Sequence, residues 1–184
     1  MKQDVERRKP EGLLDYLSLV VTTFGVGYLP LAPGTWGSMV GVLIYLGVDR
    51  WYTGIRSSGF GYFNGPPQAH IFALLAVLLL IFFLVSILAS GRAIKLLGNT
   101  DPSVAVVDEV LGQLITFTFV PFGIGWPFIL AGFLLFRLFD IWKPYPIDSL
   151  QVLPGGIGVC ADDILAGVYA GVCLSVLYAI TLSI

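Results

Sequence analysis

The feature that most constrains this chain is an uncharged run from Ile71 to Ser90, built mainly of Leu, Ile, Phe and Ala. As a helix rising about 1.5 Å per residue, it would be about 30 Å long, the thickness of a bilayer's hydrocarbon core. Composition agrees with this, because hydrophobic residues make up 57% and charged residues only 12% of the 184 residues. A soluble domain of this composition would lack the polar surface to cover itself. The sequence therefore predicts a membrane protein.

Three other uncharged stretches indicate further membrane segments. Ile164 to Ile184 predicts a second spanning helix. Tyr16 to Val48 and Val110 to Phe136 are each interrupted by prolines and glycines, which break or weaken helices. The first predicts a short helix over Leu13 to Phe24 and a membrane-entering helix over Ser38 to Trp51, and the second predicts a helical hairpin or a kinked span. The expected fold is all-α, a polytopic membrane bundle with broken or re-entrant helices, and irregular backbone at membrane depth indicates a site.

The basic residues predict how the bundle is oriented. With a cytoplasmic N-terminus, the loop after the first span holds only Arg50 and Arg56. The cytoplasmic segments then hold eight basic residues: Lys2, Arg7, Arg8, Lys9, Arg92, Lys95, Arg137 and Lys143. This asymmetry follows the positive-inside rule. We therefore expect a cytoplasmic tail over residues 1–12 and a single membrane domain over residues 13–184.

Outside the tail, most charged residues fall into three short clusters. The clusters are Asp101 with Asp108 and Glu109, Arg137 with Asp140 and Lys143, and Asp162 with Asp163. Taken singly, carboxylates at helix starts are explained by capping, and basic residues at a membrane edge by snorkelling. Taken together, these charged residues are not explained by capping and snorkelling alone. Two predicted helix starts carry adjacent acidic pairs, although one cap needs one carboxylate, and Asp140 has no evident capping role.

Several carboxylates that meet at a membrane surface repel one another unless a cation lies between them. Oxygen ligands suit Mg²⁺, which leaves coordination positions for water and substrate phosphate. The predicted metal ligands are Asp108, Glu109, Asp140, Asp162 and Asp163. Arg137 and Lys143 supply the complementary charge for phosphate oxygens. These seven residues are the predicted catalytic set, and Asp101 is expected in a turn or behind the ligands.

A loop rich in glycine and proline, Phe24 to Ser38, precedes the membrane-entering helix. We expect Gly34, Thr35 and Ser38 to bind substrate, because exposed N–H groups at a helix start bind anions. The loop lacks the Gly-Lys-Ser/Thr of a P-loop, and a re-entrant turn explains it equally well.

Several chemistries and partners are excluded. No arginine follows Cys160 at the spacing of a cysteine-nucleophile phosphatase. Histidine-nucleophile lipid phosphatases need at least two histidines, and the chain has one, His70. An Asp-x-Asp nucleophile motif is also absent. Metal-assisted attack by water or by a carboxylate remains. A net charge of −2 without a basic stripe excludes a nucleic-acid partner.

Four blocks of the sequence resemble those of the phosphatidylglycerophosphatase A family. They are Pro33-Gly34-Thr35-Trp36-Gly37-Ser38, Asp108-Glu109-Val110-Leu111-Gly112, Phe136 to Pro146, and Gly155 to Gly167. The resemblance implies an all-helical fold and Mg²⁺-dependent hydrolysis of the lipid phosphatidylglycerophosphate to phosphatidylglycerol and phosphate. It also implies a place in phospholipid biosynthesis, towards cardiolipin, in a bacterial inner membrane. The distribution of basic residues places the predicted active site at the cytoplasmic face of that membrane.

Two other functions fit part of the pattern. A transporter or channel subunit would use broken helices and charges to bind an ion, but its charges belong near the bilayer midplane rather than at helix ends. An alcohol phosphatidyltransferase would need a longer Asp-Gly-x-x-Ala-Arg helix motif, which the chain lacks.

Overall fold

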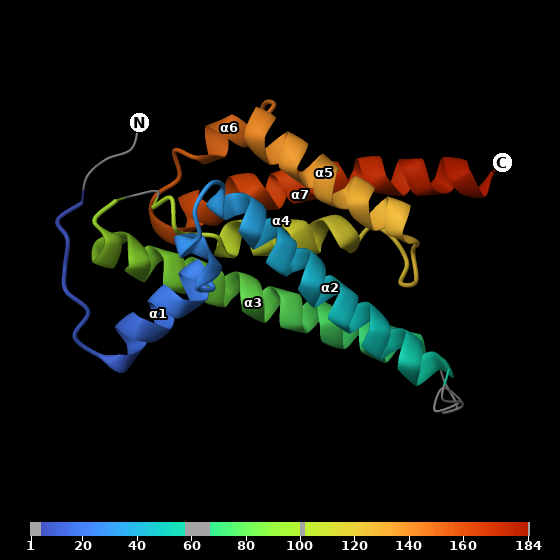
Figure 1. Cartoon of the computed structure of the whole chain (residues 1–184), viewed down its shortest axis with the longest axis horizontal. Helices are drawn as coiled ribbons and strands as arrows, with labels where there is room; N and C mark the ends of the chain where they lie inside the picture. The colour runs from blue at the N-terminus through green and yellow to red at the C-terminus, as the bar shows by residue number, and fades with distance from the viewer. Residues whose placement is uncertain (1–4, 58–66, 100–101, 184) are drawn as a thin grey trace.

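The computed structural model describes residues 5–57, 67–99 and 102–183. Within these ranges the chain forms seven α-helices and one short 3-10 helix, and no β-strand. Figure 1 shows the helices lying side by side in an elongated bundle, with the N-terminal segment before α1 and the end of α7 at opposite ends of it. The all-α prediction is confirmed. Asp101 and residues 58–66, which belong to the loop expected after the first span, lie outside the described residues.

The first interrupted stretch forms two helices, as predicted. Helix α1 spans Leu13–Thr23 and ends at Phe24 in a left-handed conformation, and the 3-10 helix η1 spans Val26–Tyr28. Helix α2 spans Pro33–Ser57, so it begins five residues before the predicted start at Ser38. The predicted boundary was wrong because proline is tolerated in the first helical turn and the following glycines are favoured by close packing.

The two long apolar helices are α3, Pro67–Leu97, and α7, Gly155–Leu182. Both are long and apolar enough to cross a membrane. Only 6% of the most apolar window of α3 and 28% of that of α7 is buried inside the protein. A core helix of a soluble protein would be mostly covered, so this exposure favours contact with lipid.

The second interrupted stretch is a helical hairpin, one of the two predicted alternatives. Helix α4 spans Val107–Phe117 and helix α5 spans Trp126–Trp142. The connection between them is held to α2, because the backbone N–H of Gly123 donates to the carboxylate of Asp49. A short helix α6, Ile147–Leu150, links α5 to α7.

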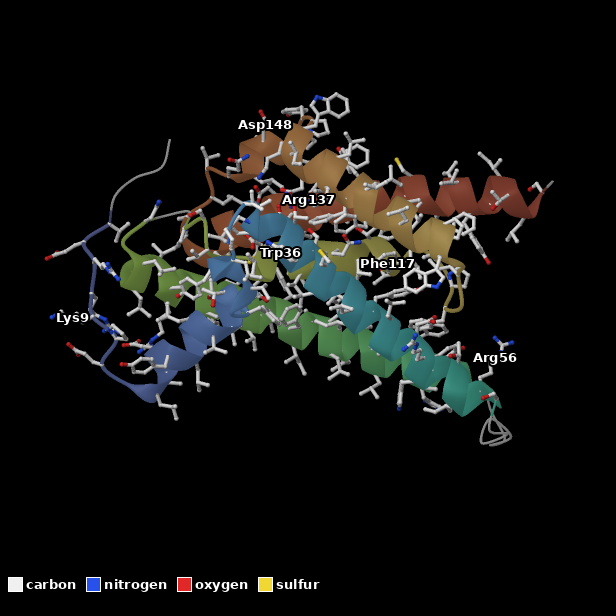
Figure 2. All side chains as sticks on the ribbon, viewed as in Figure 1. Lys9, Trp36, Arg56, Phe117, Arg137 and Asp148 are labelled. Carbon is white, nitrogen blue, oxygen red and sulfur yellow. The ribbon has the colours of Figure 1, made fainter. Side chains whose placement is uncertain are left out.

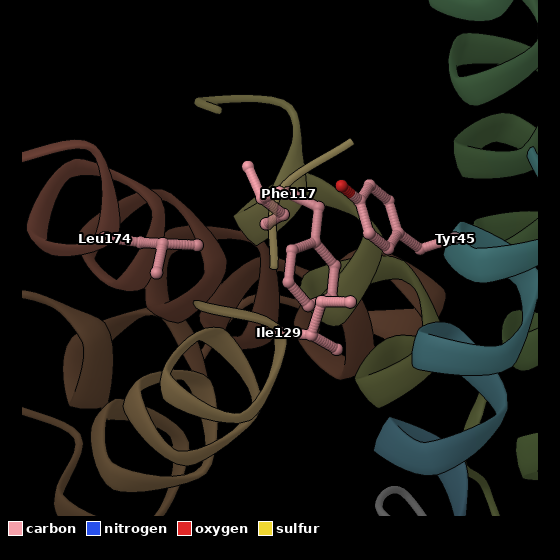
Figure 3. Packing of buried hydrophobic residues seen from close by; sticks show 5 residues of the cluster. Tyr45, Phe117, Ile129 and Leu174 are labelled. Atoms are coloured by element: carbon pink, nitrogen blue, oxygen red, sulfur yellow. The ribbon is translucent and has the colours of Figure 1, made fainter. Parts of the chain in front are cut away.

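An apolar core holds the hairpin between α2 and α7. Its buried members are Tyr45, Phe117, Ile124, Ile129 and Leu174. The rings of Tyr45 and Phe117 stack with centroids 4.2 Å apart, and Leu174 approaches from α7 (Figure 3). Burial of these side chains stabilises the position of α4 against α2, α5 and α7.

Helices α4 and α7 cross at two glycines. A Cβ atom on Gly167 would lie 3.0 Å from the carbonyl carbon of Gly112, so only residues without a side chain allow this approach. The Thr116 hydroxyl, on α4, donates to the Gly112 carbonyl at 3.0 Å. Both helices begin at the same end of the bundle (Figure 1). Asp108 and Asp163, each four residues before its glycine, therefore lie one turn from the crossing on the same side.

The N-terminal segment is bound to the same end of the bundle. The guanidinium of Arg8 donates to both oxygens of Asp15, at 2.8 and 2.7 Å, and Arg92 at the end of α3 also pairs with Asp15. Asp15 is 1% exposed. The backbone N–H of Glu11 and the side chain of Arg92 hold the pKa of the Asp15 carboxyl below its usual value.

Candidate active site

A cavity of about 640 Å³ opens where α4 and α7 begin and α5 ends. Six of the seven predicted catalytic residues line it, all except Arg137: Asp108, Glu109, Asp140, Lys143, Asp162 and Asp163. Figure 1 shows the starts of α4 and α7 close together at one end of the bundle, with the end of α5 above them. Tertiary structure thus brings together three segments that are distant in sequence.

Three carboxylates form the tightest group in this cavity. Asp108, Glu109 and Asp163 each offer an oxygen within 4.8 Å of the others. Asp108 and Asp163 are buried, and Glu109 is half-buried. Within the described ranges, Glu109 Oε2 is buried without a hydrogen-bond partner. Three close, poorly hydrated carboxylates are unfavourable when ionised, so this is where the chain most needs a cation.

The other two carboxylates are paired with basic side chains. Asp140, on α5, binds Arg137 one turn earlier and lies 3.8 Å from the Lys143 ammonium. Asp162, on α7, accepts a hydrogen bond from Lys143. The five predicted ligands therefore divide into two that are ion-paired and a group of three that has no ion pair with any described residue.

Lys143 is held in place by the end of α5. It follows the last residue of that helix with a φ of 45°, in the left-handed region, and its N–H donates to the Phe139 carbonyl at 2.8 Å. Burial alone would lower the pKa of Lys143, but the hydrogen bond that its ammonium donates to Asp162 and the charges of Asp162, Asp163 and Asp140 raise this pKa above the usual value. The ammonium is therefore charged at neutral pH and faces the cavity.

Asp162 and Asp163 do not open a helix, contrary to the sequence-based prediction. Helix α7 begins at Gly155, nine residues before the predicted start at Ile164, so both carboxylates lie inside it. Capping therefore does not explain these two buried side chains, because a helix interior has no free N–H groups. Asp108 and Glu109 do lie in the first turn of α4, as predicted.

The predicted substrate-binding residues of α2 lie behind the carboxylates. A Cβ atom on Gly34 would lie 2.9 Å from an Arg137 nitrogen and would also collide with Glu109. Ser38 is fully buried and donates to the Gly34 carbonyl at 2.8 Å. Within the described residues, the cavity wall includes none of Gly34, Thr35, Ser38 and Arg137. This part of α2 supports Glu109 and Arg137 by close packing.

A family model described as phosphatidylglycerophosphatase A matches residues 19–178, and this range contains every charged residue of the cavity. The chain belongs to the phosphatidylglycerophosphatase A family. Membership makes it an enzyme, a phosphatase that hydrolyses phosphoric monoesters. The recognition of this family from four sequence blocks is confirmed.

Three relatives match this chain over most of their own length. A phosphatidylglycerophosphatase A from Haemophilus influenzae is 36% identical over 88% of each chain. One from Escherichia coli is 30% identical over 82% of this chain and 76% of its own. A Bacteroides thetaiotaomicron protein, provisionally named phosphatidylinositol-3-phosphatase, is 35% identical over 86% of this chain and 91% of its own. No solved structure gives a significant match.

Sequence reasoning within the family's blocks missed part of the cavity wall. Uncharged residues complete the wall, and they are Pro102, Ser103, Ala105, Gln151, Val152, Leu153, Pro154, Gly155, Gly158 and Val159. Gln113 was also missed: it is fully buried one turn below Glu109 on α4, and no described residue pairs with its amide atoms. The i to i+4 spacing from Glu109 was the only signal for Gln113.

Proposed function

We propose that this phosphatase hydrolyses phosphatidylglycerophosphate to phosphatidylglycerol and inorganic phosphate. The observation that carries the proposal is the meeting of Asp108, Glu109 and Asp163 in a cavity that Lys143 also faces. Anionic oxygens beside a fixed cation suit a phosphomonoester bound through a divalent ion. Family membership and two relatives named phosphatidylglycerophosphatase A support this substrate.

The residues of the cavity fit Mg²⁺. Among the described residues, Arg137 and Lys143 are the basic partners of the five carboxylates, which leaves three negative charges in excess if all are ionised. The orphaned Glu109 oxygen lies in the group of three, where that excess is greatest. We propose Asp108, Glu109 and Asp163 as the ligands. Asp140 and Asp162 remain candidates that would have to release their basic partners.

The chain's own residues supply binding, orientation and proton transfer. Lys143 binds a phosphate oxygen from its position between Asp140 and Asp162, and Arg137 holds Asp140 in place. A carboxylate of the group takes the proton of the attacking water as oxygen bonds to phosphorus and the bond to the lipid alkoxide breaks. The alkoxide takes up that proton from the carboxylic acid, directly or through water, and leaves as phosphatidylglycerol, while the phosphoryl group leaves as inorganic phosphate. A bound divalent ion would add electrostatic stabilisation of the negative charge on the phosphoryl oxygens.

We propose that the cavity faces the cytoplasm from the inner membrane of a bacterium. The bundle end where α4 and α7 begin carries Lys9, Arg56 lies at the opposite end, and Arg137 lies between them (Figure 2), paired with Asp140 at the cavity. Apart from Lys2, which is not described, the other basic residues assigned to the cytoplasm are at or near this end: Arg7, Arg8, Arg92, Lys95 and Lys143. The positive-inside rule supports this orientation, with α2, α3 and α7 crossing the bilayer.

The test is phosphate release by purified protein from phosphatidylglycerophosphate in detergent micelles, with phosphatidic acid as a second monoester. We expect turnover of the first that stops when a chelator is added and returns with excess Mg²⁺. Turnover that survives exhaustive chelation would contradict the metal assignment. Absence of turnover with Mg²⁺ present would contradict the substrate.

Phosphatidylinositol 3-phosphate is a second candidate substrate, because the Bacteroides relative carries that name at 35% identity. Both lipids present a phosphomonoester beyond a polar linker, so the carboxylate group and Lys143 serve either. The same assay with this lipid decides between them: a higher kcat/KM for the inositol lipid would replace phosphatidylglycerophosphate as the proposed substrate.

A further inference from the structure

Helices α2 and α4 pack along a seam that pairs glycines on one helix with polar side chains on the other. The seam consists of Gly34, Gly37 and Gly41 on α2 and of Glu109 and Gln113 on α4. A Cβ atom on Gly37 would lie 3.3 Å from the Glu109 Cβ, and one on Gly41 would lie 2.7 Å from the Gln113 Cβ. Both polar side chains therefore leave α4 on the face that packs against α2.

Gln113 lies in this seam with its amide group buried. The residue is fully buried, and neither Oε1 nor Nε2 has a hydrogen-bond partner among the described residues. A buried amide without a hydrogen bond is unfavourable by about 1–3 kcal/mol. A methionine would fill a similar volume without this penalty, so packing alone does not explain a glutamine at this position.

The polar group that complements Gln113 is the carboxylate of Glu109, one turn earlier on α4. Its Oε2 atom is a buried acceptor without a partner within the described ranges, and Nε2 of Gln113 is a donor. Side chains on a helix lean toward its N-terminus, so Gln113 leans toward Glu109. Their Cβ atoms are about 5–6 Å apart at this spacing, and a glutamine can hydrogen-bond an acidic side chain across one turn. A change of rotamer in Gln113 is therefore enough to satisfy both groups.

Both ends of the seam then act on the same carboxylate. Gly34 leaves room for Glu109 beside Arg137, where a Cβ atom would collide, and Gln113 approaches from one turn further along α4. A carboxylate that ligates a metal ion keeps its orientation when its other oxygen accepts a hydrogen bond. Loss of such a partner lowers metal affinity by about 10- to 100-fold.

We propose that Gln113 is a positioning residue of the candidate active site, whose amide N–H donates to Oε2 of Glu109 and holds this carboxylate toward Asp108 and Asp163. The inference rests on the proposed function, in which Glu109 is a ligand of Mg²⁺. It adds a residue outside the described cavity wall that acts through Glu109 and touches neither the substrate nor the ion. Gln113 strengthens Mg²⁺ binding because it reduces the orientational freedom that Glu109 loses when the ion binds.

The experiment measures Mg²⁺ binding without substrate, from the dependence of the melting temperature of the purified full-length protein on Mg²⁺ concentration. In Gln113→Met, which keeps the length of the side chain and removes its donor, we expect the apparent dissociation constant to rise about 10- to 100-fold. The Mg²⁺ concentration for half-maximal phosphate release should rise by the same factor, and excess Mg²⁺ should restore most of the release. Gln113→Leu is a second apolar variant with the same expected result.

The matched control is Thr116→Val. Thr116 is also fully buried on α4, but its hydroxyl donates to the Gly112 carbonyl at 3.0 Å. Valine keeps the shape of the side chain and removes this hydrogen bond. We expect the variant to lose about 1 kcal/mol of stability and to keep the wild-type dissociation constant for Mg²⁺.

A wild-type dissociation constant in both Gln113 variants, or an equal rise in Thr116→Val, would overturn the positioning role. A merely structural role would lower the melting temperature equally with and without Mg²⁺ and would leave the dissociation constant unchanged. In those cases the proposed function stands, because wild-type protein still binds Mg²⁺ and hydrolyses the lipid. A wild-type melting temperature that does not respond to Mg²⁺ would instead overturn the proposed metal site, and the role of Gln113 with it.

Discussion

Lys143 donates a hydrogen bond to Asp162, although nineteen positions of the chain separate the two residues. The first follows the end of α5 and the second lies inside α7, so this ion pair joins the hairpin to the last helix at the candidate active site. It also neutralises one of five neighbouring carboxylates. The same ammonium is the cation best placed to bind a substrate phosphate.

Replacing Lys143 tests this double role. We expect Lys143→Met to lower kcat/KM for the lipid by about 10²- to 10³-fold, since a fixed charge that stabilises the reacting phosphate is removed. Steady-state phosphate release measures the effect. The control is Lys95→Met, because Lys95 is exposed near the end of α3 at the same end of the bundle. Equal losses in both variants would contradict a specific role for Lys143.

Neutralising a carboxylate of the group of three should separate activity from stability. We expect Asp163→Asn to reduce phosphate release at least about 10²-fold, because a metal ligand or base is lost. In chelator its melting temperature should not fall, since one of three repelling buried charges is gone. Asp108→Asn should behave in the same way. Near-normal turnover would remove the residue from the site, and a lower melting temperature in chelator would refute the repulsion argument.

The close packing of α2 against the site predicts an unusual effect of a single methyl group. Gly34→Ala should reduce activity strongly, because the new Cβ collides with Glu109 and lies 2.9 Å from an Arg137 nitrogen. Gly47→Ala is the matched control on the same helix, since nothing lies within 4 Å of a Cβ there. That control should keep full activity and gain up to about 1 kcal/mol of stability. A fully active Gly34→Ala would show that α2 does not position Glu109.

Asp15 gives the fold a dependence on pH. Its pKa is lower in the folded protein than in the unfolded chain, because Glu11 N–H and Arg92 bind its ionised form. This contribution to stability is present above the unfolded pKa, about 3.9, and is lost as pH falls through the lower folded pKa. Asp15→Asn should therefore lower the melting temperature at pH 7, and its difference from wild type should shrink below about pH 4. A difference that stays constant with pH would contradict this linkage.

The bounds of a helix could be predicted best where its sequence is an unbroken apolar run, and least well where glycines interrupt it. Helix α3 follows from an unbroken apolar run, and the hairpin of α4 and α5 follows from the prolines and glycines at its tip. The starts of α2 and α7 could not be predicted, because Gly34 and Gly156 weaken a helix when considered locally. In the folded chain both glycines allow another element to approach where a side chain would not fit, and that packing extends the helix.

The sequence by itself determined an all-helical, apolar chain whose few acidic residues fall in short clusters, because hydrophobicity and charge are local properties of the residues. Only the tertiary structure decided which of those residues meet. Asp108 and Asp163 lie together because α4 and α7 cross at Gly112 and Gly167, and Lys143 joins them through the end of α5. Such contacts depend on the distance between helix backbones, which is set by packing across the whole bundle and not by any one segment.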